Sequence, residues 1–126
     1  MYDEWQEVAV STLYSHHGGR ENRVRWFTKS SSAKNPLSLN IGVMAGEVLG
    51  FPRNIRIQVR DGMIRFRPYQ DDADAEIAVA VPVYGDKKHP TQVSTRVDFS
   101  PTGAKAGELW PWVQDGPWIV ATRNGS

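Results

Sequence analysis

The segment "IRIQVRDGMIRFRP", residues 55–68, constrains the fold more than any other part of the chain. Asp61 and Gly62 stand between two runs in which apolar and polar residues alternate, which is the strongest short-range signal for a β-hairpin. A two-residue type I′ turn, with positive φ at both central residues, would place Arg56 directly opposite Arg67. The segment therefore predicts an antiparallel hairpin of defined register.

That register gives the hairpin two chemically different faces, because successive side chains of a strand point to opposite sides. One face is apolar and carries Ile55, Ile57, Val59, Ile64 and Phe66. The other face carries Arg56, Gln58, Arg60, Met63, Arg65 and Arg67. A shift of the register by one residue would mix the two sets, so the pattern specifies the pairing.

The arginine face has two interpretations. Arg56 and Arg67 would repel each other by up to about 1 kcal/mol as directly opposed like charges. The charges could simply point into water. Alternatively, the face binds an anion, either phosphate or the carboxylates of a partner, because the planar guanidinium fork binds both groups in a bidentate way.

Composition bounds the class of protein. A chain of 126 residues with 40% hydrophobic and 23% charged residues is typical of one soluble domain. The absence of cysteine excludes disulfides and thiolate metal sites. No apolar run approaches the roughly 18 residues of a membrane span, and the first ten residues lack the pattern of a signal peptide. We expect a single cytoplasmic domain over residues 1–126, with no membrane partner.

Charge is divided unevenly although the formal net charge is only +1. Residues 1–69 hold ten Lys and Arg against six Asp and Glu, and residues 70–126 hold five against eight. Such asymmetry either points to an anionic partner or lets the two halves complement each other.

Short alternating runs, eleven glycines and eight prolines predict a mainly β fold, a small barrel or sandwich. Within it, Val43, Met44 and Val48 lie at helical spacing before Gly50, which predicts one short helix near residues 43–50.

An internal sequence similarity suggests how the strands are organised. "VRDGMIRFR" at residues 59–67 and "VQDGPWIVA" at residues 113–121 align without a gap. An alternating strand precedes each of them, which predicts two pseudo-repeats, 37–68 and 92–123, each running strand, connector and hairpin. The acidic stretch 69–76 would link them. Chance is the alternative, because Asp-Gly hairpins are common.

Other residue clusters give no support for catalysis. His16, His17 and His89 lack the spacing of zinc ligands, and the acidic stretch lacks the glycine and glutamate of an EF-hand loop. Neither a nucleophile elbow nor a phosphate-binding glycine loop is present in the sequence. We therefore expect no metal, no cofactor and no enzymatic activity.

Two further features each allow two interpretations. The acidic stretch is expected to be a solvated linker, and the alternative is that its carboxylates mimic phosphate and cover the arginines. The tryptophans are expected to pack in the core and in a dimer contact, and the alternative is base stacking or a protein contact. They are Trp5, Trp26, Trp110, Trp112 and Trp118.

Residues 37–68, "LSLNIGVMAGEVLGFPRNIRIQVRDGMIRFRP", resemble the swapped-hairpin unit of the AbrB/MazE family. The shared pattern is a strand, a short helix ending in Leu-Gly, a tight turn, a strand, an Asp-Gly turn and a strand. The matching positions are Leu39, Ile41, Val48, Leu49, Gly50, Ile55, Ile57, Val59, Asp61, Gly62, Ile64 and Arg67. Arg53-Asn54 stands where the family usually has Gly-Asp, and the first strand lacks the family's basic residues. In layout the whole chain resembles small uncharacterised proteins of phages and prophages.

The resemblance implies a homodimer of interleaved hairpins and a regulatory protein that binds nucleic acid, expected to be DNA. Phosphate contacts would supply affinity, and a two-stranded ribbon fits the major groove. The expected contact residues are Arg53, Arg56, Arg60, Arg65 and Arg67, flanked by Arg23 and Arg25. The alternative is a phage-type protein-interaction module, an inhibitor or adaptor, that binds an acidic host protein. Both interpretations expect the arginines to lie outside the core.

Overall fold

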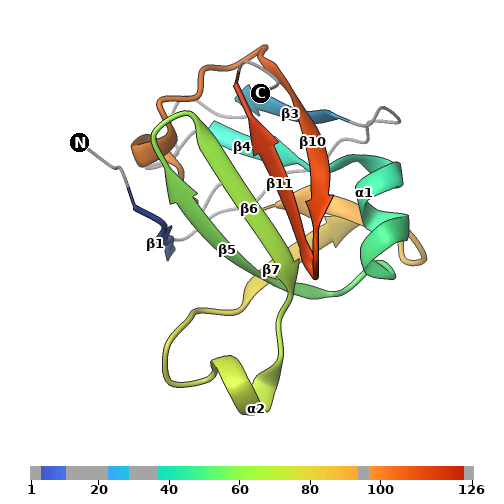
Figure 1. Cartoon of the computed structure of the whole chain (residues 1–126). Helices are drawn as coiled ribbons and strands as arrows, with labels where there is room; N and C mark the ends of the chain where they lie inside the picture. The colour runs from blue at the N-terminus through green and yellow to red at the C-terminus, as the bar shows by residue number, and fades with distance from the viewer. Residues whose placement is uncertain (1–3, 11–22, 29–36, 94–96, 124–126) are drawn as a thin grey trace.

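The computed structural model of the chain describes residues 4–10, 23–28, 37–93 and 97–123. Within these ranges, eight antiparallel strands close into a small barrel, which confirms the mainly β fold and the barrel prediction (Figure 1). The order around the barrel is β5 (Asn54–Arg60), β6 (Met63–Pro68), β11 (Trp118–Thr122), β10 (Leu109–Asp115), β3 (Arg23–Thr28), β4 (Leu37–Asn40), β8 (Pro90–Val93) and β7 (Val81–Gly85), which returns to β5.

Strand β5 carries two different neighbours on its outer edge. Its first residues pair with β7, which closes the barrel, with Ile55 opposite Val81. Further along, the two-residue strand β1 (Gln6–Glu7) pairs with β5, and Glu7 lies opposite Gln58. Next along the chain, β2 (Ala9–Val10) pairs with β9 (Val97–Asp98) in a separate sheet. Of the segment before residue 11, Gln6 and Glu7 therefore lie along the predicted hairpin.

The helix expected near residues 43–50 is present as α1 (Gly42–Leu49), and it packs against β8 and β3 (Figure 1). Gly50 ends it with φ of 79°, in the left-handed region that suits glycine. A 3₁₀ turn, η1 (Ser100–Thr102), precedes β10. The stretch expected to be a linker contains a short helix, α2 (Asp71–Asp74), beyond the end of the barrel. None of the helices within the described ranges is long and apolar enough to cross a membrane.

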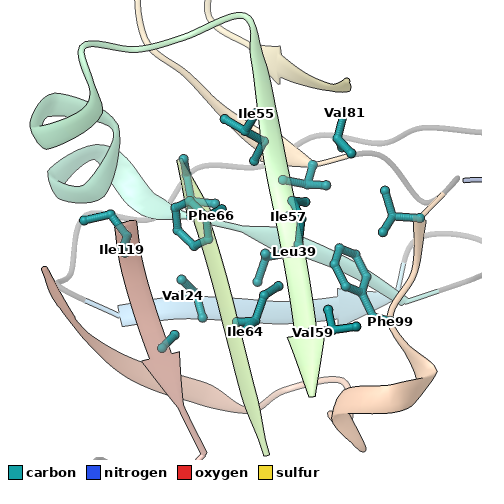
Figure 2. Packing of buried hydrophobic residues seen from close by; sticks show 14 of the residues in the cluster. Val24, Leu39, Ile55, Ile57, Val59, Ile64, Phe66, Val81, Phe99 and Ile119 are labelled. Atoms are coloured by element: carbon teal, nitrogen blue, oxygen red, sulfur yellow. The ribbon is translucent and has the colours of Figure 1, made fainter. Parts of the chain in front are cut away.

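The predicted apolar face of the hairpin forms one wall of the core, and all five of its residues are buried (Figure 2). Trp26 packs edge-on against Phe99 and Trp110, with ring centroids 4.9 and 5.1 Å apart. Trp26 and Trp110 are almost fully buried, so core packing is confirmed for these two tryptophans. Burial of each large apolar side chain contributes about 1.5–3 kcal/mol, so this cluster is the main source of stability.

The register of the β5–β6 hairpin is confirmed, with Arg60 opposite Met63 at the turn. The turn type is not the predicted one, because Phe51 is the one non-glycine residue in the described ranges with positive φ, whereas a type I′ turn needs it at Asp61 as well. Neighbouring segments determine this turn. The Gly62 N–H donates to the Thr102 carbonyl at 3.0 Å, and the Gly62 carbonyl accepts from the Arg123 N–H at 3.0 Å.

The second hairpin, β10–β11, turns one residue later than its apparent counterpart. Asp115 pairs with Trp118, so its loop is Gly116-Pro117 rather than Asp-Gly. A shift of one residue exchanges the two faces of a strand. Ile119 is therefore buried in the core, although it aligns with Arg65 in the gapless comparison. The pseudo-repeats 37–68 and 92–123 and the single-domain organisation stay predictions.

Candidate functional site

The outward side of β5, β6 and β11 forms a continuous patch that we call the arginine–tryptophan surface. Its position follows from the strand alternation that buries the apolar face of the hairpin. β11 contributes one tryptophan, and the residue before β1 contributes another. The surface consists of Arg56, Arg60, Arg65, Arg67, Trp5 and Trp118.

Arg65 lies at the centre of this surface, between two indole rings. Its guanidinium carbon is 4.6 Å from the ring centroid of Trp5 and 4.2 Å from that of Trp118. Its Nε–H donates to Gln58 Oε1 at 2.7 Å. Burial lowers the pKa of Arg65, and the neighbouring charge of Arg56 acts in the same direction. Within the part of the chain that the structure describes, Arg65 forms no ion pair.

Arg60 also contacts Trp5, with its guanidinium carbon 4.8 Å from the ring centroid, and its Nε–H points to Met63 Sδ at 3.0 Å. Each such contact between a guanidinium and an indole contributes on the order of 0.5–2 kcal/mol. Arg60, Trp5, Arg65 and Trp118 therefore form one connected cluster of cations and rings on the surface.

Arg67 is held by a buried carboxylate of α2. Its Nη1 and Nη2 donate to Asp74 Oδ2 at 2.9 Å and Oδ1 at 2.7 Å. The Gln70 N–H also donates to Oδ2, at 2.8 Å, and Asp74 is only 1% exposed. The hydrogen bonds from Arg67 lower the pKa of Asp74 from 3.8 to about 2. This pair is part of the folded structure rather than of an exposed face.

Arg56 bridges two carboxylates. Its Nη1 donates to Asp74 Oδ1 at 3.1 Å, while its Nε and Nη2 donate to Glu7 Oε1 at 3.1 Å and Oε2 at 3.3 Å. The hydrogen bond to Glu7 is the largest of the effects that raise the pKa of Arg56. Gln58 Nε2 donates to the same carboxylate of Glu7.

These contacts correct the prediction of an open arginine face. Arg56 and Arg67 keep only 14% and 10% of their side-chain area exposed, because Glu7 and Asp74 cover that end of the hairpin. Arg67 is buried for the same reason, although it lies on the outward side of the hairpin and does not belong to the hydrophobic core cluster. The acidic stretch is not wholly solvated either, and its alternative interpretation, carboxylates that cover the arginines, is confirmed for Asp74.

The remaining predicted contact residues lie elsewhere on the barrel. Arg53 is exposed in the turn before β5. Arg23 and Arg25 belong to β3, which is separated from β6 by β10 and β11. Arg23 is exposed, and Arg25 is partly buried with its guanidinium carbon 5.4 Å from the ring centroid of Phe27. The structure thus brings together four of the seven predicted arginines.

Sequence reasoning did not assign Glu7 to this site, and it offered the acidic stretch only as an alternative, without singling out Asp74. Glu7 and Arg56 are 49 positions apart in the sequence, so no local sequence pattern predicts their contact. Asp74 is one of four acidic residues in the acidic stretch, and the sequence does not distinguish it from the three exposed ones. Within the described ranges no group of three His, Asp or Glu side chains could hold a metal ion, and His16 and His17 lie outside these ranges.

Comparison of the chain with protein-family models, with curated proteins and with solved structures gives no match.

Proposed function

We propose that this protein binds single-stranded nucleic acid, with DNA as the first candidate, across the arginine–tryptophan surface. The observation that carries the proposal is the position of Arg65 between Trp5 and Trp118 on the outside of the barrel. Proteins that bind single strands combine aromatic rings, on which bases stack, with cations that neutralise the backbone. Arg65 and its two rings offer both chemistries in one place.

The charge of the surface supports an anionic ligand. Arg56, Arg65 and Arg67 lie on it, and the ion pairs described for these three involve two carboxylates, those of Glu7 and Asp74. Within the described ranges Arg65 forms no ion pair, although the charges of Asp115 and Glu7 partly oppose the lowering of its pKa by burial. Phosphate groups of a nucleic acid would supply the missing negative charge and would make binding dependent on salt.

The neighbours of the hairpin favour a single strand over a duplex groove. A two-stranded ribbon can enter the major groove of B-DNA, which is about 12 Å wide. Here β11 flanks β6 on one side, and β1 and β7 flank β5 on the other, so the hairpin is part of a wider wall. Such a wall offers its outer face instead of inserting as a ribbon. The homodimer, the regulatory role and the cytoplasmic location belong to the proposal as predictions from sequence.

A second candidate is a protein-interaction module that binds an acidic partner. The specific observation in its favour is that the ligands already seated on the arginines are carboxylates, those of Glu7 and Asp74. Arginine and tryptophan are also the residue types most enriched at energetic centres of protein interfaces.

Fluorescence anisotropy with a labelled thymidine oligonucleotide of about ten nucleotides tests the first proposal. We expect binding that weakens steeply from low to moderate salt. Arg65→Ala should weaken it by about tenfold or more, because both a cation and the packing of two rings are lost. Lys87→Ala is the matched control: it removes the same charge from an exposed position in the β7–β8 loop, and it should change affinity little.

The outcomes separate the two candidates. Equal losses in both variants would mean that general charge attraction, and not this surface, binds the oligonucleotide. Binding to poly-glutamate that matches or exceeds binding to an oligonucleotide of equal charge would favour the acidic protein partner. Light scattering with and without the oligonucleotide measures the mass and tests the predicted homodimer.

A further inference from the structure

The carboxylate of Glu7 is surrounded by donors that resemble those of a phosphate site. Arg56 approaches it with the Nε–Nη2 edge of the guanidinium, in a bidentate arrangement with distances of 3.1 and 3.3 Å. Gln58 Nε2 donates to the same carboxylate from the neighbouring outward position of β5. A guanidinium edge together with an amide N–H is equally suited to two oxygens of a phosphodiester.

Asp74 keeps this donor set in place independently of Glu7. Its Oδ1 accepts a hydrogen bond from the remaining nitrogen of Arg56, Nη1, at 3.1 Å, and hydrogen bonds from Arg67 and from the Gln70 N–H fix the carboxylate in turn. The edge of Arg56 that faces Glu7 would therefore keep its orientation if Glu7 were removed. Arg56 and Arg67 together carry two positive charges against the single charge of Asp74, so one negative group is needed to balance them.

The two carboxylates are held very differently. Asp74 is 1% exposed and accepts four hydrogen bonds, from both nitrogens of Arg67, from Arg56 and from a backbone N–H. The side chain of Glu7 is 30% exposed and belongs to a strand that pairs with β5 at only two positions. An exposed ion pair of this kind is weak, whereas a buried one is costly to break. Glu7 is thus the carboxylate that a ligand could replace.

We propose that Arg56 and Gln58 form a phosphate subsite of the arginine–tryptophan surface, which Glu7 occupies in the unliganded protein and a backbone phosphate takes over on binding. This inference rests on the proposed function, because the phosphate belongs to the same nucleic acid. The site takes a singly charged phosphodiester in exchange for a singly charged carboxylate, so the charge balance around Arg56 is preserved. Asp74 acts as a positioning residue and contacts no ligand.

The test compares Glu7→Gln with Glu4→Gln in the same oligonucleotide assay. Both variants remove one negative charge from the segment before residue 11, and Glu4 is an exposed residue three positions earlier. Glu7→Gln should bind roughly three- to tenfold more tightly than Glu4→Gln, because the phosphate no longer competes with a charged carboxylate. Its logarithmic salt slope should be no shallower, since the Arg56 contact is still made.

A second measurement uses the wild-type protein, so it does not depend on how a variant folds. The NMR signal of the Arg56 Nε–H, which donates to Glu7 Oε1, should shift on addition of the oligonucleotide. Thermal unfolding of both variants verifies that they are folded.

Each outcome has a defined meaning. Equal affinities of the two variants, or an Arg56 signal that does not move, would overturn the subsite while the wild-type binding leaves the proposed function intact. A weaker Glu7→Gln variant would also overturn it, because Glu7 would then support the surface instead of competing for it. If no form of the protein binds the oligonucleotide, the proposed function fails and the subsite fails with it.

Discussion

The two neighbouring hairpins of the barrel share the same short pattern near their turns and present opposite chemistry on their outer faces. β5–β6 and β10–β11 both contain Val-x-Asp-Gly followed by alternating residues, and they lie side by side through the pairing of β6 with β11 (Figure 1). In the first hairpin the loop is Asp61-Gly62, and in the second it is Gly116-Pro117. One position of difference in the turn is enough to exchange the inner and outer faces.

This difference explains how the arginine–tryptophan surface arises. Because the second hairpin is displaced by one residue, Ile119 enters the core and Trp118 points outward, where it meets the guanidinium groups of β5 and β6. With the turn of the first hairpin, Trp118 would face the core as Ile64 does. The site therefore depends on a register that the local sequence pattern does not reveal.

The largest effect that would test this comparison comes from the aligned pair Ile119 and Arg65. Ile119→Ala should cost about 3–4 kcal/mol of unfolding free energy, because it leaves a cavity in a fully buried position. Arg65→Ala should cost less, about 1–2 kcal/mol, because the side chain lies on the outer face and loses its two contacts with indole rings without leaving a core cavity. Urea unfolding measures both values. Equal losses would mean that the two positions face the same environment and that the assigned register of β10–β11 is incorrect.

The sequence predicts what depends on local pattern. Strand alternation on both sides of Asp61-Gly62 is sufficient for the register of β5–β6 and for the five residues of its buried face. The spacing before Gly50 is sufficient for α1. The predicted turn type is wrong because Gly62 donates a hydrogen bond to Thr102 and accepts one from Arg123, and both residues are distant in sequence. The rule that relates loop length and residue type to turn type does not include hydrogen bonds from distant segments.

The candidate site was predictable only in part, for a related reason. Alternation places the arginines together on one face, but their partners come from β1 and from α2, which no periodicity connects to the hairpin. Burial of Asp74 among exposed acidic neighbours depends on the position of Arg67, a tertiary property. Sequence reasoning therefore found the cations, offered the acidic stretch as a cover for them only as an alternative, and missed Glu7.

A second, smaller effect concerns the ion pair between Arg67 of the first hairpin and Asp74, which has no counterpart among the ion pairs described for the second hairpin. The pKa of Asp74 lies at about 2 in the folded protein, below its ordinary value of 3.8. As pH falls, the Asp74 carboxylate is therefore protonated in the unfolded chain before it is protonated in the folded protein. The ionised Asp74 stabilises the folded state fully above about pH 4, and this stabilisation is lost as pH falls towards about 2. We expect a loss of about 1–2 kcal/mol from this group. Urea unfolding at about pH 5 and about pH 2.5 measures it.

Two variants isolate the contribution of Asp74. In Arg67→Ala the acid dependence should become smaller, because Arg67 is the main cause of the lowered pKa. Asp71→Asn changes an exposed acidic residue of the same helix and should leave the dependence unchanged. An unchanged acid dependence in Arg67→Ala would contradict the assignment of the lowered pKa to this pair.

The smallest effect separates the two turns themselves. Gly62 and Gly116 have φ of 72° and 60°, and at both positions an added Cβ meets no atom within 4 Å. Alanine therefore introduces only backbone strain, on the order of 1–2 kcal/mol where the conformation is retained. Gly116 lies in an exposed loop that can relax. Gly62 is held more firmly, because its N–H donates to Thr102 and its carbonyl accepts from Arg123. Gly62→Ala should thus destabilise the protein more than Gly116→Ala in thermal or urea unfolding. The reverse order would mean that the bonds to Thr102 and Arg123 do not constrain the first turn, and the explanation of its unexpected geometry would then have to be sought within the hairpin.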